Sequence, residues 1–435
     1  MLGFTVKMPY FCCKSTSMNY NTFNINKLLE GIVTGSGTNL DLNKLFEDKL
    51  VEYNISKRKA SDLLNIDLRT LDDTLAGNAK QPSIINIIKI AHFLEITDLY
   101  QAISAILKNQ ESENIGSIER ASDASFIAKN FDIKKLTQVG FFKPKDEPKK
   151  LINRVLTFFG YSSVFEFERA VNVPLYSRTK RGYSDKMKDF WVKSAIQCFK
   201  DINNPNEYNR EALKDIITKI KPYCQDVELG LVTVCKALYN VGVTVIFQSH
   251  LTLTQVRGGT FVINSKPCIV LTDLNKKYTT IWETLLHELH HVLYDLEAIE
   301  AKGYHLTGDP DLLLIEDKSE DFSREYFCGR DDYEYIKPHI HTHFLVERFA
   351  KELEVHPSFV YSSFRQFEQL LNNRNYYAHF KEYFPPYQTA LQKLNPITWK
   401  ENSLAEIAEN IKSIFDLNDI KNEKSKIKQG EKNTI

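Results

Sequence analysis

Residues 287–291 carry the side chains that most directly imply chemistry: histidine, glutamate, leucine, histidine and histidine. His287 and His291 stand four residues apart, which places two side chains one turn apart on the same face of an α-helix. Two imidazoles so placed can bind one metal ion, and Glu288 can act as general base on a water in the same site. The segment therefore matches the H-E-x-x-H pattern and predicts a zinc-dependent hydrolytic site.

The segment 279–298 around this pattern has the periodicity of a long amphipathic helix. Its apolar stripe recurs at three- and four-residue intervals and consists of Trp282, Leu285, Leu286, Leu289, Val292, Leu293 and Leu296. His290 falls on this stripe, so we expect it to pack against the core or to support the site, not to bind the metal. The alternative for the whole segment is a buried helix whose histidines only make ordinary hydrogen bonds.

Three β-rich segments precede this helix. Residues 242–248, 258–264 and 268–274 contain many β-branched side chains and are bounded by glycine and proline, as expected of strands. From about Asp189 to the first of them the pattern is helical. We therefore expect an α+β fold in which a small mixed sheet supports the helix of the H-E-x-x-H pattern.

The run 242–294 resembles the ImmA/IrrE metallo-endopeptidases, whose strands and HELGH helix follow one another in the same order. The stretch 346–367, VERFAKELEVHPSFVYSSFRQF, is similar to the terminal helices of that family. This chain has His290 where the family usually has glycine. The resemblance implies a zincin-like metallopeptidase domain over residues 189–380. It also implies that the outer histidines of the motif and a carboxylate of the next helix bind Zn²⁺, with Glu288 as the catalytic base.

We look for the third zinc ligand in residues 315–324, IEDKSEDFSR. Members of the family often read E-x-x-A-x-x-F-A at this place, a register that makes Glu316 the ligand. In that register the remaining positions are Ser319, Phe322 and Ser323. Another register of the family puts Lys318 at the acidic position, where a protonated amine cannot bind zinc. Glu316 is therefore the first choice and Glu320 the second; a weak or decayed site is the remaining alternative.

Other polar residues are less specific candidates. Three histidines stand at alternating positions before a helix: His339, His341 and His343. They could form a second metal site, and the alternative is that they are exposed or cap the helix. His356 precedes Pro357, and the resemblance allows it to border the active-site cleft or to cap a helix. Tyr278 and Arg257 are candidates for stabilising an oxyanion.

Residues 41–108 have the pattern of four or five short helices. Ser56 is a plausible N-cap for the second of these helices, and Gly77 closes the third, as a glycine C-cap does. The order of helices and turns resembles the XRE-type helix-turn-helix, with "AGN" at the end of the recognition helix. The alternative is a small helical bundle of another kind.

DNA binding by this segment depends on charge. Residues 41–108 contain nine Lys and Arg against ten Asp and Glu, a poor balance for neutralising phosphates. Asp72 and Asp73 also lie in the expected recognition helix. The candidate DNA contacts are Lys57, Arg58, Lys59 and Arg69. The alternative is a protein-docking or dimerisation module that keeps only the fold.

The chain of 435 residues is long enough for about three domains, and its 56 basic residues balance its 56 acidic ones, so no global field attracts a polyanion. No apolar run reaches the roughly 18 residues of a membrane-spanning helix, and Lys7 and Pro9 interrupt any secretory signal. The seven cysteines form no CxxC pair, as expected of reduced thiols in the cytoplasm. The expected organisation is a variable segment at 1–40, the helix-turn-helix domain at 41–108, a linker with connecting helices at 109–188, the metallopeptidase domain at 189–380, and a C-terminal helical segment with a polar tail at 381–435.

Two functions follow as hypotheses. The first is a cytoplasmic regulatory zinc endopeptidase, whose protein substrate the resemblance implies to be a repressor or an antitoxin-like regulator. The second is a DNA-binding transcription regulator or antitoxin-like protein whose peptidase domain is decayed or only senses a metal. Operator DNA is a possible partner, a membrane is not expected to be one, and the sequence leaves open whether the chain forms a homodimer.

Overall fold

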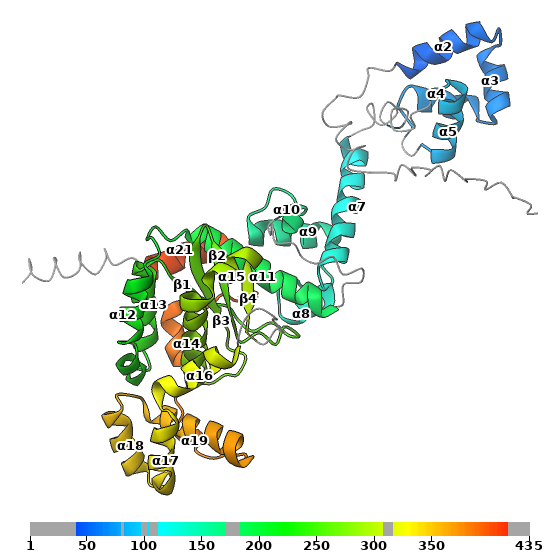
Figure 1. Cartoon of the computed structure of the whole chain (residues 1–435). Coiled ribbons are helices and arrows are strands. Elements are labelled where there is room, and N and C mark those ends of the chain that lie inside the picture. The colour runs from blue at the N-terminus through cyan, green and yellow to red at the C-terminus, as the bar shows by residue number, and fades with distance from the viewer. Residues whose placement is uncertain are drawn as a thin grey trace, which may run out of the picture. The chain divides into compact units, whose positions relative to one another are not determined.

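The computed structural model divides the chain into two compact units, Met1–Ser122 and Asp123–Ile435, which we treat separately (Figure 1). It describes residues 41–79, 82–96, 103, 112–169, 183–307 and 316–415. The expected variable segment 1–40 and polar tail 416–435 lie outside the described residues. Within the described residues, no helix is long and apolar enough to cross a membrane.

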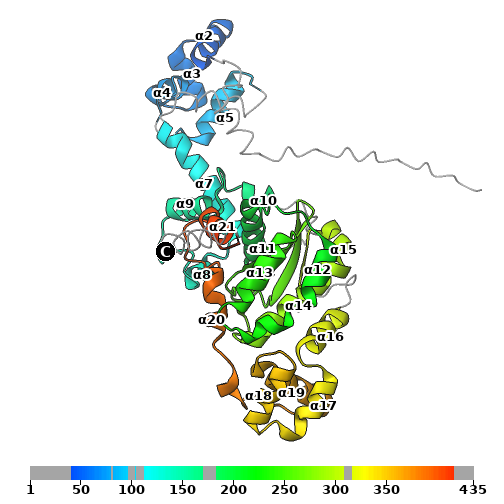
Figure 2. The same cartoon turned by 90° about the vertical axis from the view of Figure 1, so that its left-hand side faces the viewer.

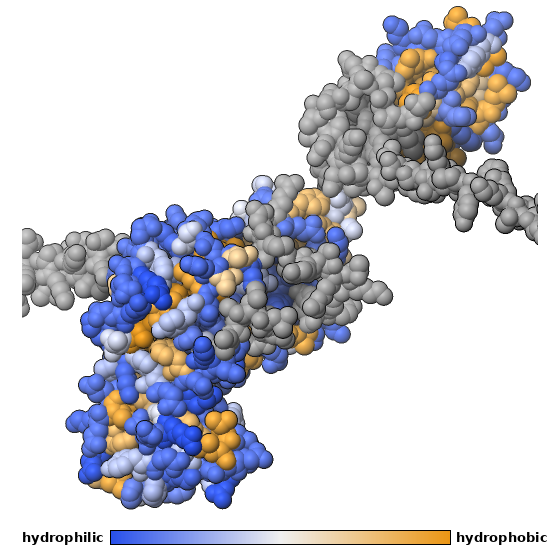
Figure 3. All heavy atoms as spheres, viewed as in Figure 1, coloured by the Kyte–Doolittle hydropathy of each residue, from blue (hydrophilic) through white to orange (hydrophobic). Residues whose placement is uncertain are grey.

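Over the described residues 41–96, the N-terminal unit has four short helices around one core. They are α2 (Leu42–Glu52), α3 (Lys57–Leu64), α4 (Leu68–Leu75) and α5 (Ile84–Phe93). The Ser56 hydroxyl accepts a hydrogen bond from the backbone N–H of Lys59 and caps α3, as the sequence predicts. The core includes Phe46, Ala60 and Leu71. Apolar surface is also exposed on this unit (Figure 3), including Ile85 of α5 at 61% of its full exposure.

The stretch 109–188, expected as a linker with connecting helices, is helical over most of its described residues. Its first part belongs to a long helix, α7 (Ser112–Asn130), followed by α8 (Ile133–Gln138), α9 (Pro148–Phe159) and α10 (Glu166–Arg169). From residue 123 onward this stretch is part of the second unit. The reason is aromatic packing: Phe141 lies 5.0 Å from Phe158 and 4.8 Å from Phe190, ring centre to ring centre. Because residues 110–125 are mostly polar, the sequence does not indicate that the residues after them belong to the core of the second unit.

The second unit continues with helices that precede and follow a small sheet. Before the sheet come α11 (Tyr183–Ile202), α12 (Arg210–Ile217), η1 (Lys221–Gln225) and α13 (Gly230–Asn240). After it come α16 (Glu316–Phe327), α17 (Arg330–Ile336), η2 (Lys337–His339), α18 (His343–Glu352), α19 (Pro357–Asn372), η3 (Lys381–Tyr383), α20 (Tyr387–Leu391), η4 (Gln392–Leu394) and α21 (Leu404–Phe415). Figure 2 shows α17, α18 and α19 grouped together beyond α16. The C-terminal helix α21 packs on α11, so the segment from 381 also belongs to the core of this unit.

The sheet has four strands in the order β1-β3-β2-β4. These are β1 (Thr244–Phe247), β2 (Gly258–Ile263), β3 (Lys266–Leu271) and β4 (Tyr304–Leu306). The β1–β3 pair is parallel, whereas β2 pairs antiparallel with both β3 and β4. The sheet is therefore mixed. Two of its strands, β1 and β2, lie in the segments that the sequence marks as β-rich, and β3 overlaps the third segment but begins two residues before it. The short β4 has no such signal.

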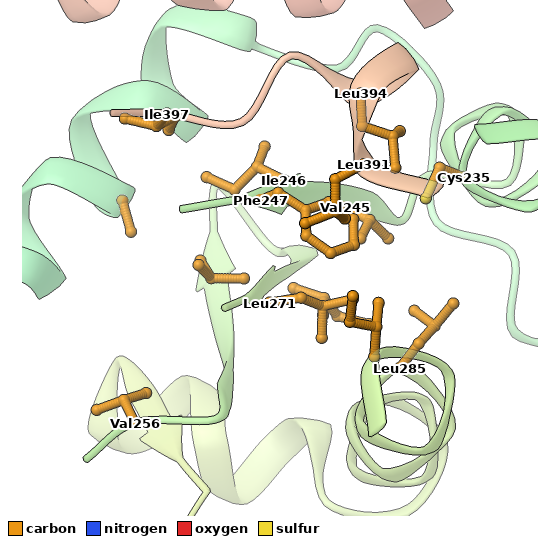
Figure 4. Packing of buried hydrophobic residues seen from close by; sticks show 14 of the residues in the cluster. Cys235, Val245, Ile246, Phe247, Val256, Leu271, Leu285, Leu391, Leu394 and Ile397 are labelled. Carbon is orange, nitrogen blue, oxygen red and sulfur yellow. The ribbon is translucent and has the colours of Figure 1, made fainter. Parts of the chain in front are cut away.

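Helices cover both faces of the sheet, and β2 shows how. Successive side chains of a strand point to opposite faces. Phe261 faces α11, where its ring lies 5.9 Å from Phe199, and Thr260 faces α14 (Tyr278–Tyr294), where it bonds Glu288. Figure 4 shows side chains of β1, β3, α14 and the C-terminal Leu391 and Leu394 gathered in this core.

The predicted helix at 279–298 is two helices in the structure. The first, α14, ends at Tyr294, and α15 (Leu296–Lys302) begins after Asp295, whose backbone departs from helical geometry. The break brings the chain back to the sheet as β4, beside β2. The metal-binding pattern thus lies on a buried helix held between the sheet and α16.

Candidate metal centre and adjoining cleft

His287 and His291 meet on α14 as their spacing predicts. Their Nε2 atoms lie 3.2 Å apart, and both side chains are buried. The two rings cross at 72° with centres 4.8 Å apart. Two nitrogen atoms thus point at one position in the protein interior.

Glu316 supplies a carboxylate at the same position. It is the first residue of α16, the helix that packs against α14. Its Oε2 lies 3.1 Å from Nε2 of His287 and its Oε1 lies 3.7 Å from Nε2 of His291. The donor atoms of these three residues all fall within 4.8 Å of one another, so they form a group that could hold a metal ion.

The alternatives for the third ligand lie elsewhere. Glu320, one turn further along α16, faces Arg257 at 3.3 Å and Arg324 at 3.8 Å. Lys318 is exposed on the same helix. Of the two glutamates considered in the sequence, Glu316 is therefore the one beside the histidines.

Asp295 orients His291 and was not identified from the sequence. Its Oδ2 lies 2.8 Å from Nδ1 of His291, so the carboxylate accepts a hydrogen bond and Nδ1 carries the proton. The lone pair of the imidazole is then on Nε2, the atom that faces His287 and Glu316. Such carboxylate–histidine pairs are usual behind metal ligands. The sequence spacing could have indicated this pair, because Asp295 follows His291 by four residues, one turn of a helix.

His305 is a fourth buried group at this centre that sequence reasoning missed. It pairs with Thr260 across β4 and β2, and directly opposed residues share a face of the sheet. That face is turned to α14, so His305 lies with its ring centre 4.6 Å from that of His291 and its Nε2 2.7 Å from Oε1 of Glu316. An isolated histidine in a three-residue strand gives no usable pattern.

The surroundings of His291 and Glu316 favour the forms of these two side chains that bind a metal. Burial lowers the pKa of His291, with only partial compensation by the nearby Glu288 and Asp295 carboxylates. Burial alone would raise the pKa of Glu316, but hydrogen bonds from His287 and His305 outweigh it and hold that pKa below its usual range. A neutral imidazole and an ionised carboxylate are the protonation states that metal ions require.

Glu288 is fully buried on the sheet side of α14. The hydroxyl of Thr260 donates to its Oε2 at 2.7 Å, and the hydroxyl of Thr307 donates to its Oε1. Gly258 makes room for this carboxylate, because a Cβ there would lie 2.8 Å from Oε1 of Glu288. Thr260 and Thr307 were not identified from the sequence, which marks no strand position as facing the motif.

The remaining histidines occupy structural positions. Nδ1 of His290 lies 2.9 Å from the Ser319 hydroxyl on α16, so His290 joins two helices, as its place on the apolar stripe suggests. It also lies close to His291 and Asp295, although these two already bond each other. His356 caps α19 by accepting from the Ser358 backbone N–H at 3.2 Å.

The second metal site considered at His339, His341 and His343 is not formed. Nδ1 of His343 lies 2.9 Å from the Tyr361 hydroxyl, and its Nε2 lies 3.2 Å from Glu347. Within the described residues, the three do not form a group that could hold a metal. Alternating positions on a turn do not bring these side chains together.

A cleft of about 660 Å³ adjoins the centre and is bordered by His287, Thr307 and Arg257. Tyr278 does not take part in it: this residue is fully buried, and its hydroxyl donates to the backbone oxygen of Cys224 at 2.8 Å. The expectation that Tyr278 stabilises an oxyanion is therefore wrong, whereas Arg257 does lie at the cleft.

In the N-terminal unit, the four candidate DNA contacts differ in environment. Lys57 forms ion pairs with Asp72 at 2.7 Å and with Glu47 at 3.5 Å. Arg58 and Lys59 are exposed on α3. The side chain of Arg69 is 91% exposed and lies 3.9 Å from Asp73. Three of the four cations therefore face solvent.

Comparison of the chain with protein families, with curated proteins and with solved structures gave no match. The fold is a mixed α+β arrangement, mostly helical, with one small four-stranded sheet. Its most distinctive feature is the group of two buried histidines, His287 and His291, and the half-buried Glu316, which could hold a metal ion beside a cleft.

Proposed function

We propose that the protein is a zinc-dependent endopeptidase. The observation that carries the proposal is the convergence of His287, His291 and Glu316 beside a cleft, with Glu288 on the same helix turn. Two imidazoles and one carboxylate, with a further position left for water or substrate, are the donor set of a catalytic zinc. The hydrogen bond from His291 to Asp295 supports the same assignment, because it turns the Nε2 lone pair toward the common point.

When bound, Zn²⁺ supplies Lewis acidity, which polarises a scissile carbonyl and makes water more acidic. The chain supplies the proton transfers and the positioning. Glu288 takes the proton of the attacking water and passes it to the leaving amine. Thr260 and Thr307 donate to both oxygens of Glu288 and so fix the orientation of this base. Arg257, at the cleft, is placed to contact the substrate backbone or the developing oxyanion.

The substrate we propose is a polypeptide, and the similarity of the motif region to the ImmA/IrrE peptidases makes a repressor or antitoxin-like regulator the first candidate. The cleft of about 660 Å³ is of a size that accommodates several residues. The four-helix N-terminal unit, with its XRE-like order of helices, would then direct the peptidase to its substrate or to operator DNA.

The test separates metal binding from catalysis. Glu288→Gln should leave the zinc stoichiometry at one per chain and abolish cleavage of a co-expressed or added protein substrate, because Glu288 is not one of the three metal donors and its carboxylate is hydrogen-bonded to Thr260 and Thr307 instead. His291→Ala should remove most of the zinc, because it deletes one of those donors. Elemental analysis and gel-based cleavage assays on the purified proteins check both. Full zinc content in His291→Ala, or loss of zinc in Glu288→Gln, would refute the assignment.

A second candidate function, a DNA-binding regulator, is favoured by one observation. Arg58, Lys59 and Arg69 face solvent on α3 and α4, and Asp72, one of the two acids in the expected recognition helix, is paired with Lys57. Specific binding to the promoter of its own operon, with no cleavage by the zinc-loaded protein, would favour the regulator over the peptidase.

A further inference from the structure

Two cations of the cleft form no ion pair with any acid among the described residues. Lys277 and Arg365 both line the cleft, and neither forms an ion pair within the described part of the chain. Nε and Nη2 of Arg365 are buried without a hydrogen-bond partner there. The two side chains rest on aromatic rings instead: Nζ of Lys277 lies 4.1 Å from the ring centre of Tyr377, and Cζ of Arg365 lies 4.2 Å from that of Phe384.

The other cations of the cleft are neutralised. Arg257 and Arg324 both pair with Glu320, and Arg324 also pairs with Asp321 at 2.8 Å. The uncompensated positive charge is therefore confined to the part of the cleft around Lys277 and Arg365.

Two acids act on these cations from a distance, Glu283 on Lys277 and Glu382 on Arg365, but neither forms an ion pair with them within the described residues. Glu283 lies on α14 one turn before His287, and its Oε1 accepts from the Ser362 hydroxyl at 3.1 Å and from Nε2 of Gln366 at 3.0 Å. Burial raises the pKa of Glu283, and these hydrogen bonds lower it only in part. For Lys277, burial first and the neighbouring Arg365 second lower the pKa, so the local field disfavours a further cation.

Partly buried cations without a counter-charge are costly for a protein, and contact with aromatic rings offsets only part of that cost. Arginine and lysine together are well suited to a carboxylate, because the guanidinium can donate two parallel hydrogen bonds and the ammonium adds a point charge. A ligand with a carboxylate would satisfy both groups.

We propose that Lys277 and Arg365 form a subsite for a carboxylate of the substrate chain, either an acidic side chain or the C-terminus. This inference rests on the proposed peptidase function and adds a substrate class to it. Lys277 precedes His287 by ten residues along α14, a rise of roughly 15 Å. An extended peptide covers that distance in about four or five residues. The carboxylate is therefore expected about four or five residues from the cleaved bond.

The experiment uses the zinc-loaded full chain and a library of peptides made from a bacterial proteome, with cleavage sites identified by mass spectrometry. The wild type should show Asp and Glu enriched about five- to tenfold at one position four or five residues from the cut. The variant Lys277→Gln with Arg365→Gln should cut but lose that enrichment. The matched control is Arg348→Gln with Lys351→Gln on α18, where both side chains are exposed and outside the cleft; it should keep the enrichment.

The two sources of the carboxylate give different patterns. An acidic side chain gives enrichment at a fixed position in peptides of any length, whereas a C-terminal carboxylate gives cuts at a fixed distance from the peptide end. Cleavage by the wild type with neither pattern, or the same pattern in the Lys277→Gln, Arg365→Gln variant, overturns the subsite.

A binding measurement keeps the subsite separate from catalysis. Immobilised Glu288→Gln protein should retain carboxylate-rich peptides from the same library, and adding Lys277→Gln and Arg365→Gln should abolish that preference. If the wild type cleaves no peptide, the proposed peptidase function is refuted. The retention measurement alone then tests whether Lys277 and Arg365 bind a carboxylate. Retention without a preference for carboxylates refutes the subsite even if cleavage is observed. Circular dichroism and zinc content verify that each variant is folded.

Discussion

Glu316 and Glu320 stand one turn apart on α16, yet only Glu316 reaches the two imidazoles, at 3.1 Å and 3.7 Å. The difference arises because Glu316 is the first residue of the helix, where it faces α14, whereas Glu320 turns toward Arg257 and Arg324. The pair therefore offers a matched test of the third ligand.

Glu316→Gln should weaken zinc binding by at least about 100-fold, because it removes one of three donors, a larger effect than the roughly 10–100-fold typical of a supporting residue. Glu320→Gln should leave zinc affinity unchanged, since its carboxylate pairs with arginines of the cleft. Competition with a chromophoric chelator measures both affinities. Equal losses in the two variants would mean that neither glutamate is the specific ligand.

Asp295 is hydrogen-bonded to His291 at 2.8 Å, so in the proposed zinc site it would act on the metal through that histidine. Asp295→Asn should lower zinc affinity by roughly 10–100-fold, because an amide stabilises the required tautomer less well than a carboxylate. Glu297→Gln, an exposed acid on α15, is the control and should have no effect. The same chelator competition applies, and an unchanged affinity in Asp295→Asn would show that His291 is oriented by the helix alone.

At the residue scale, sequence spacing was sufficient only within one helix. The i, i+4 rule places His287 and His291 correctly and could also have marked Asp295, because all three depend on the geometry of a single turn. Choosing between Glu316 and Glu320 required the family register. Thr260, His305 and Thr307 come from the sheet, where facing the site depends on a strand register that no local pattern encodes.

At the scale of elements, the close contact between β2 and α14 holds the base in place. Gly258 is the position of closest approach: a Cβ there would lie 2.7 Å from Cγ2 of Thr284 and 2.8 Å from Oε1 of Glu288. Since His305 pairs with Thr260 on the neighbouring β4, any shift of β2 also moves a residue that contacts Glu316.

Gly258→Ala should therefore lower the thermal stability, by about 1–3 kcal/mol as for other overpacked cores, and reduce any peptidase activity. Adding Thr284→Ser removes one of the two clashing atoms and should restore part of the stability. Thermal unfolding followed by circular dichroism measures both variants. A stability of Gly258→Ala equal to that of the wild type would show that β2 and α14 are not tightly held.

The sequence predicted elements better than their connections. β-branched runs located β1, β2 and β3, and apolar periodicity located the helix of the metal centre. The end of that helix was placed four residues late, because Leu296 continues the apolar stripe although the chain breaks at Asp295. β4 is too short to show alternation, and the helices between residues 123 and 169 were expected as connecting helices, without a prediction that they pack into the core of the second unit.

At the scale of the whole molecule, each of the two units has its own core, and all donors of the metal centre belong to the second. The group that could hold a metal ion thus lies within residues 123–435, and none of its three donors comes from the N-terminal unit. The charge balance of the N-terminal unit was readable from the sequence, but the partner of each cation was not, because Lys57 and Asp72 are fifteen residues apart and on different helices.

Lys57 and Arg58 are adjacent on α3, yet substitution of Lys57 should change mainly the stability, and substitution of Arg58 should change mainly DNA binding. Lys57 pairs with Asp72 and Glu47, so Lys57→Gln should cost at most about 1 kcal/mol of stability and change DNA binding little. Arg58 is exposed, so in a DNA-binding unit Arg58→Gln should leave stability unchanged and reduce the dependence of log affinity on log salt by about one.

Fluorescence anisotropy with a duplex from the promoter of its own operon, over a range of salt concentrations, measures the affinity and its salt dependence. Because counterion release scales with the number of phosphates contacted, contacts from Arg58, Lys59 and Arg69 alone predict a slope of about −3, which is modest for a DNA-binding domain. If the wild type shows no salt-dependent binding, or if Lys57→Gln changes the slope as much as Arg58→Gln does, then α3 does not face DNA. The N-terminal unit would then dock a protein instead.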